Sequence, residues 1–170
     1  MSLMPIEQAK AWRYALALYH YPPLAEHAIN LQDAYGMNVN GLLLAAYLDH
    51  VGASVPSDWG GELKNAITDS EYDLCQHRLK RRQAKPGPLH IYQALKDEEL
   101  QMEFAQHERM ISLINQRYLS VQAVDACEQP QATALESFLS SYDLPQSYLN
   151  EVSDRLLVAQ NTANINTLDE

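Results

Sequence analysis

Five basic side chains gather in one stretch of eight residues, a density that suits the binding of an anion. This basic segment covers residues 78–85 and holds Arg78, Lys80, Arg81, Arg82 and Lys85. As an external contact, it would bind an acidic protein, a phosphate-bearing ligand or an anionic lipid surface. Two plainer readings compete with this one. Cations are favourable in the last turn of a helix, and the segment could pair with the chain's own acidic residues 97–99.

A group of polar residues lies where two predicted helices meet. Asp33 and Asn40 could hold a small ligand at this junction. The same residue types are also expected from local structure alone, because Gly36 suits the left-handed end of one helix and Asn38 suits the N-cap of the next. We therefore expect capping to account for most of this group.

Tyrosines and histidines cluster just before and within the second predicted helix. A histidine beside Glu26 or Asp33 would suit general acid–base chemistry, although amphipathic residues at a surface explain the same cluster. Pro22-Pro23 separates His20 from His27, so these two side chains need not share a face. Taken with the junction above, an alternative pocket among the first three helices would be formed by Tyr19, His27, Asp33 and Asn40.

Three further polar residues share one helical face at spacings of four: Glu99, Glu103 and His107. Glutamate and histidine can ligate metals, but a di-iron bundle needs Glu-x-x-His pairs, and the sequence contains none. His107 also falls on an apolar stripe with residues 100, 104, 111 and 114, where a hydrogen-bonded core histidine is expected. The chain has no phosphate-binding glycine loop, dinucleotide fingerprint, serine elbow or Cys-x-x-Cys pair. No catalytic residue, metal or cofactor is assigned.

Charge and composition narrow the function classes. The 170 residues carry a net charge of −10, which argues against general nucleic-acid binding because phosphate contacts need a basic face. The imbalance lies in the second half, where residues 86–170 hold 4 basic and 13 acidic side chains, against 8 and 9 in residues 1–85. The apolar run 42–48 is far shorter than the ~20 residues that cross a bilayer. Without a secretory signal, Cys75 and Cys127 are expected to be reduced thiols in a cytoplasmic protein.

Helical periodicity dominates the chain, and no segment alternates as a strand would. Helices are expected over residues 5–21, 24–35, 39–51, 62–83 (with a break near residue 68), 89–119, 132–142 and 147–160. This pattern predicts an all-α, single-domain bundle of six to seven helices with no significant sheet. The domain is expected to span residues 4–160, with residues 161–170 as a flexible tail.

Several of these motifs together resemble a known family. The chain reads Trp12-Arg13-Tyr14-Ala15, then Leu31-Gln32-Asp33 before Gly36, then Asn38-Val39-Asn40 before Leu42-Leu43-Leu44. This resembles a family of short, uncharacterised bacterial proteins classed as a domain of unknown function, whose pattern has Trp-x-x-Ala, Leu-Gln-Asp-x-x-Gly and Asp-Val-Asn-Leu-Leu-Leu. Asn38 stands where the pattern has Asp, and both residues cap helices well. The resemblance implies a single helical domain and supplies no activity.

Two functions are therefore carried forward. The first is a non-enzymatic interaction module that uses the basic segment to contact an acidic protein or an anionic ligand. The second is a small-molecule-binding protein or enzyme that uses the alternative pocket. The missing catalytic signatures favour the first. A homodimer is one way in which a bundle of this kind buries an apolar face.

Overall fold

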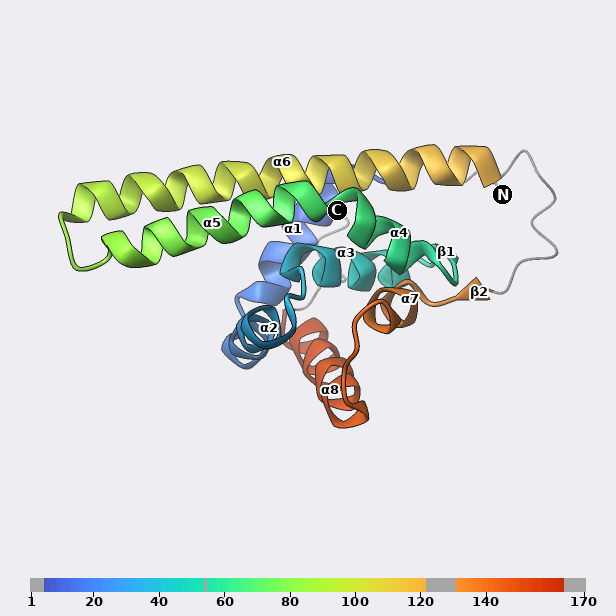
Figure 1. Ribbon diagram of the computed structural model, residues 1–170. Helices are drawn as coiled ribbons and strands as arrows, with labels where there is room; N and C mark the ends of the chain where they lie inside the picture. Colours follow the sequence, from blue (N-terminus) through green and yellow to red (C-terminus); the bar gives the residue numbers. More distant parts are fainter. Residues whose placement is uncertain (1–4, 54, 122–130, 164–170) are drawn as a thin grey trace.

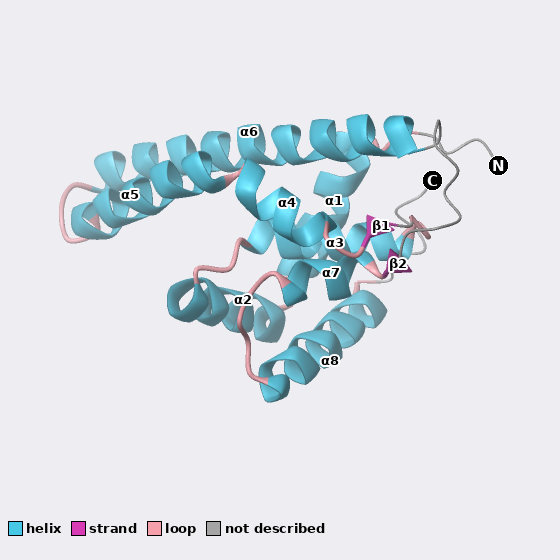
Figure 2. Cartoon of the chain, turned by 45° about the vertical axis from the view of Figure 1, so that its right-hand side comes forward, coloured by secondary structure: helices cyan, strands magenta, loops and turns pink. Residues whose placement is uncertain are grey.

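The computed structural model describes residues 5–53, 55–121 and 131–163, and these residues are almost entirely helical (Figures 1 and 2). The helices are α1 (Gln8–Tyr19), α2 (Pro22–Tyr35), α3 (Val39–His50), α4 (Trp59–Ala66), α5 (Thr68–Ala84), α6 (Leu89–Val121), α7 (Ala134–Ser140) and α8 (Gln146–Thr162). Two short strands, β1 (Val55–Pro56) and β2 (Gln131–Ala132), pair antiparallel. The all-α class is confirmed. The described residues form eight helices rather than six to seven, because the expected 62–83 helix divides at Ile67.

Helix α3 forms the centre of the bundle. Every residue from 41 to 48 is buried, as expected for a helix that is apolar on all sides rather than along one stripe. Helices α1, α6 and α7 all contact it. Its N-terminus is held by Asn38, whose side-chain oxygen accepts a hydrogen bond of 2.7 Å from the Gly41 amide. The capping role expected for Asn38 is therefore confirmed.

Helices α5 and α6 form a long antiparallel hairpin (Figure 1). Pro86 and Pro88 lie at the turn between the two helices. Proline has no backbone N–H to donate, so neither residue can continue α5 with a normal helical hydrogen bond. The 33 residues of α6 extend for roughly 50 Å, and the turn end of the hairpin projects beyond the other helices in both views. Helix α5 buries only Leu74 and Arg78. Most of its surface is therefore open to solvent.

Helices α2, α7 and α8 lie on the side of the bundle away from this hairpin (Figure 2). Helix α8 packs against α2, where Arg155 donates a hydrogen bond of 2.8 Å to the Pro23 carbonyl oxygen. Helix α7 packs closely on α4, and the Gly60 amide donates to the Ser137 hydroxyl at 2.9 Å. Asp49 accepts hydrogen bonds from the first two amides of α7, at 2.7 and 3.1 Å.

Within the described part of the chain, no helix combines the length and apolarity needed to cross a membrane. Cys75 is a free, exposed thiol, whereas Cys127 lies outside the described residues, as do residues 164–170 of the expected tail. Helix α8 continues to Thr162, two residues past the expected end of the domain. A cytoplasmic location stays a prediction.

Candidate functional site

A charged cluster lies at the centre of the contact between α5 and α6. Arg78 of α5 is buried, and its guanidinium donates to Glu71 Oε1 at 3.0 Å and to Glu103 Oε1 at 3.2 Å. Its Nε lies 3.8 Å from Glu99 Oε1. Glu71 and Arg78 are seven residues apart on α5, and Glu99 and Glu103 are four apart on α6, so each helix presents its pair on one face. We call these four residues the Arg78 cluster.

A layer of uncharged polar groups ties the Arg78 cluster to α3. The Asn38 amide nitrogen donates to Glu71 Oε2 at 2.6 Å and to Gln106 Oε1 at 2.8 Å. Gln106 in turn donates to the Ser70 hydroxyl at 3.0 Å, and the Asn38 backbone amide donates to the Tyr142 hydroxyl at 3.2 Å. Asn38 is thus both the cap of α3 and the bridge between three segments of the chain.

The Arg78 cluster holds one cation and three carboxylates, and Arg81 adds a second cation through its pair with Glu99. Burial alone would lower the pKa of Arg78, but Glu71 and Glu103 outweigh burial and raise it. The pKa of Glu103 is also raised, because burial and the neighbouring carboxylates Glu99 and Glu71 outweigh the attraction of Arg78. A partly buried carboxyl group with a raised pKa at the edge of a cavity is a recognised mark of a functional site.

A cleft of about 600 Å³ opens beside this cluster, between α1 and the α5–α6 hairpin. We call it the α1–α6 cleft. Arg78, Glu99 and Glu103 form part of its lining, and the apolar part includes Trp12, Leu16, Tyr19, Leu43 and Leu100. Phe104 extends the apolar surface, because its ring lies edge-on to Trp12 at 5.3 Å. Burial, followed by the charges of Glu103 and Glu99, raises the pKa of the Tyr19 hydroxyl.

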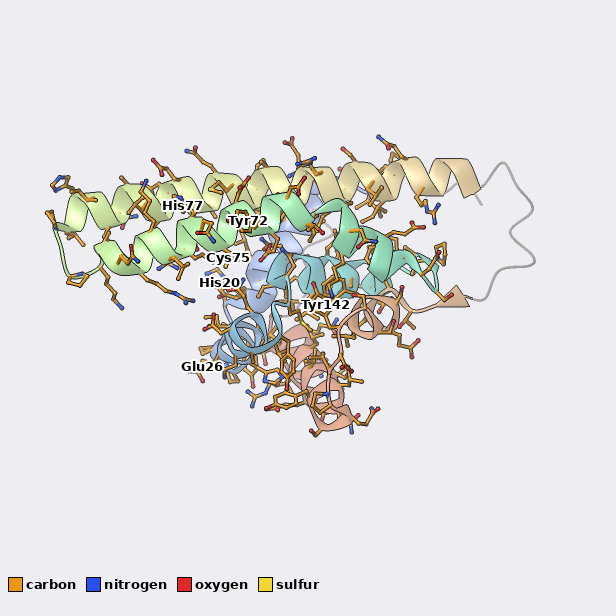
Figure 3. All side chains as sticks on the ribbon, in the orientation of Figure 1. His20, Glu26, Tyr72, Cys75, His77 and Tyr142 are labelled. Atoms are coloured by element: carbon orange, nitrogen blue, oxygen red, sulfur yellow. The ribbon has the colours of Figure 1, made fainter. Side chains whose placement is uncertain are left out.

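A second cleft, of about 510 Å³, lies on the other side of Arg78. We call it the α5–Tyr142 cleft; Figure 3 marks Tyr72 and Cys75 on α5 and also marks Tyr142. The Lys64 ammonium, which also lines this cleft, lies 4.3 Å from the centre of the Tyr142 ring. Three residues line both clefts: Gln32, Arg78 and Arg82.

The arginines of the basic segment are engaged within the molecule. Besides the buried Arg78, Arg81 donates to both Glu99 oxygens, at 2.5 and 3.3 Å, and Arg82 lies 3.1 Å from Asp33. Lys80 and Lys85 are exposed. Pairing with the acidic second half, one of the three readings of this segment, is therefore observed for Arg78 and Arg81.

The four residues of the alternative pocket do not share one cavity. Tyr19 and Asn40 line the α1–α6 cleft, and Asp33 lines the α5–Tyr142 cleft. His27 is buried elsewhere, between α2 and α8, with Nδ1 3.7 Å from Glu151 and its ring stacked on Tyr148. Burial lowers the pKa of His27 more than Glu151 raises it.

The predicted Glu99–Glu103–His107 set also divides. The two glutamates face Arg78, whereas His107 is fully buried, 5.0 Å from the Trp12 ring. The expected core position of His107 is confirmed, but its expected hydrogen bond is not, because neither ring nitrogen has a partner among the described residues. No group of His, Cys, Asp and Glu suited to a metal occurs in the described parts of the chain.

Sequence reasoning missed Trp12, Gln32, Glu71 and Gln106 as members of the site. The one signal for the apolar part of the cleft in the sequence was the apolar stripe of α6. In the structure its later residues, Ile111 and Ile114, are buried, but Leu100, which lines the α1–α6 cleft, and Phe104, which lies against Trp12, are about half exposed.

The chain matches the model of a known protein family. A family model described as a protein of unknown function, DUF2390, covers residues 10–110, more than half of the chain. The chain belongs to this family. The DUF2390 match begins within α1, contains α2 to α5 and extends into α6, so it includes the whole Arg78 cluster, whereas Tyr142 lies outside it. Neither the curated proteins nor the solved structures that were searched gave a match.

Proposed function

We propose that this DUF2390 protein is a non-enzymatic binding module that takes an amphipathic organic molecule with an anionic head into the α1–α6 cleft. The observation that carries the proposal is the meeting of half-exposed apolar side chains and a charge-paired cluster around the buried Arg78 in one cavity. The cleft volume of about 600 Å³ falls within the roughly 300–1,000 Å³ typical of small-molecule sites.

The apolar wall supports an apolar body in the ligand. Leu16, Tyr19 and Leu100 line the cleft from two helices and leave a large part of their surface in contact with water, and the exposed Phe104 lies beside them against Trp12. Contiguous apolar surface of this kind marks binding sites more often than isolated exposed side chains do. A ligand that covers these residues would remove their apolar surface from water, which is favourable.

The polar lining supports an anionic head group. Glu99 and Glu103 are already engaged by Arg78 and Arg81, so neither needs a cationic ligand. Lys96 is exposed at the cleft, with the Tyr92 ring 5.9 Å from its ammonium, and the exposed Asp97 beside it accepts a hydrogen bond of 3.1 Å from Gln93. Arg81 and Arg82 of the basic segment also line the cleft. Two arginines of the basic segment and two residues of the predicted alternative pocket, Tyr19 and Asn40, therefore line the same cleft.

The test is titration with 8-anilino-1-naphthalenesulfonate, an aromatic anion whose fluorescence rises in apolar sites. The unaltered protein should bind it with saturation, and Leu16→Glu or Leu100→Glu should weaken binding at least tenfold. Leu157→Glu on α8 is the matched control, because Leu157 is 58% exposed and Leu100 is 53% exposed. Equal binding by all three variants, with circular dichroism unchanged, would exclude the cleft as the site.

A second candidate is an interaction module at the turn end of the hairpin, with an acidic protein segment as partner. Lys80 and Lys85 are exposed there, and Leu89 is 77% exposed. Reversal of Arg81 and Arg82 would break internal ion pairs, so Lys80→Glu combined with Lys85→Glu is the cleaner variant. The unaltered chain should retain a polyglutamate probe at low salt, and the double variant should not. Failure of the unaltered chain to bind the probe would remove this candidate.

A further inference from the structure

The two clefts meet at a shared wall on α5. Arg78 is buried at the base of this wall, where the Gln32 side-chain oxygen, with its amide turned toward the guanidinium, accepts from both terminal nitrogens at 3.1 and 3.2 Å. Nearer the surface, Arg82 and Asp33 form an ion pair of 3.1 Å in which each side chain is about half exposed. Arg82 lines both clefts and Asp33 lines one, so this exposed pair stands at their shared wall.

The α5–Tyr142 cleft is elongated along α5. Its lining begins at Thr68 and reaches Arg82, fourteen residues later, a distance of about 21 Å along a helix. Tyr72, Cys75 and Leu79 lie on this face at helical spacing (Figure 3 marks the first two), and all three are exposed. The cleft is therefore long, with these exposed side chains along α5, and it shares Gln32, Arg78 and Arg82 with the α1–α6 cleft.

The barrier between the clefts is weak. An exposed ion pair contributes little to stability, because water screens the charges and both side chains lose freedom when they pair. Arg82 and Asp33 can separate without breaking the Arg78 cluster, which keeps its own carboxylate partners. A chain-like ligand can therefore pass between them at small energetic cost.

We propose that the two clefts are halves of one groove, which holds a single long-chain amphipathic carboxylate. Its head group lies in the α1–α6 cleft near Lys96 and Arg81, and its chain passes the Asp33–Arg82 pair into the α5–Tyr142 cleft. This inference rests on the proposed function and adds the shape of the ligand to it. A short-chain carboxylate occupies the first cleft only.

The chain carries a reporter in each cleft. Trp12 lines the α1–α6 cleft, while Trp59, the second of two tryptophans, is buried in the core and supplies a constant background. Cys75 lines the α5–Tyr142 cleft, and Cys127→Ser leaves it as the only thiol in the sequence. Tryptophan emission therefore reports the first cleft, and the rate of Cys75 modification by an aromatic disulfide reports the second.

The experiment compares octanoate with hexadecanoate on the full-length Cys127→Ser protein, each below the concentration at which it aggregates. Both should shift Trp12 emission, but only hexadecanoate should slow Cys75 modification, by at least fivefold. Leu79→Glu should weaken hexadecanoate binding at least fivefold and leave octanoate binding unchanged, whereas Leu157→Glu should alter neither.

The outcomes separate the two proposals. If both carboxylates shift Trp12 emission but Cys75 reacts at its original rate, the single groove is refuted and the α1–α6 site stands. Equal protection of Cys75 by octanoate and hexadecanoate would also refute the division of the groove by chain length. If neither carboxylate shifts the emission, the α1–α6 site itself fails for carboxylates, and the groove fails with it.

Discussion

His107 differs from the other buried polar residues of this protein in its surroundings. It is fully buried against Trp12, and its ring nitrogens have no partner among the described residues. Burial penalises the charged imidazolium and lowers the pKa of His107 from 6.5 to about 4. Glu103, one turn away, shows the same effect with the opposite sign, since burial disfavours its charged form and raises its pKa.

The His107 pKa predicts a loss of stability in mild acid. Below pH 6.5 the unfolded chain binds a proton at this histidine and the folded chain does not, so stability falls with pH until the folded pKa near 4. From pH 7.5 to 5.5 the loss should be roughly 1 kcal/mol. Urea unfolding should show a loss larger by this amount in the unaltered protein than in His107→Leu, because His27, whose pKa burial also lowers, contributes the same further loss to both. His90→Leu, at the exposed start of the same helix, should keep the larger loss; if His107→Leu keeps it too, the assignment to His107 is wrong.

At the scale of elements, α4 and α7 approach each other closely at Gly60, which has no side chain to keep them apart. A Cβ atom added at Gly60 of α4 would lie 2.1 Å from the Ser137 carbonyl oxygen of α7. That oxygen belongs to the backbone, which cannot move without displacing α7. At the next residue, Gly61, an added Cβ meets nothing within 4 Å.

Alanine at these adjacent glycines should therefore have opposite effects. Gly60→Ala should lower the free energy of unfolding by about 3 kcal/mol or more, because α4 and α7 must separate. Gly61→Ala should raise it by about 0.5–1 kcal/mol, because alanine favours the helix over glycine. Thermal and urea unfolding of the two variants test the pair. Similar effects at both positions would contradict the close α4–α7 contact.

At the scale of the molecule, stability is distributed unevenly between the bundle and the hairpin. Helix α3 is enclosed by its neighbours, whereas the turn end of the hairpin projects away from them (Figure 1). Segments with few buried apolar contacts open locally at much lower free energy than a core does. The Arg78 cluster lies between the enclosed α3 and the open end of the hairpin, because it joins the hairpin to α3 through Asn38.

Amide hydrogen exchange should show this difference. Residues 42–48 should exchange only on global unfolding, and residues 81–93 should exchange at least a hundredfold faster, as measured by mass spectrometry of peptides.

The same measurement also tests the expected homodimer. If protein concentration slows exchange of residues 81–93, a second copy covers the hairpin end; core-like protection at every concentration would contradict its open position in the fold.

The sequence by itself determined the elements of this protein. Helical periodicity, the proline-flanked turn at residues 86–88 and the cap at Asn38 are local signals, since each acts through the backbone within a few residues. The helical class, the long α6 and the break near residue 68 could therefore be predicted. The family resemblance rested on local motifs in the same way, and the family match confirms the membership.

Only the tertiary structure decided which charged and polar groups meet. The basic segment has the same composition whether it is solvated or paired, but the packing of α5 on α6 buries Arg78 among three carboxylates. Asn38 and Asp cap a helix equally well, yet the Asn38 amide also donates to Glu71, which an aspartate could not do while charged. These contacts join residues far apart in the chain. Their geometry depends on how whole helices pack, and a single sequence carries no local signal for it.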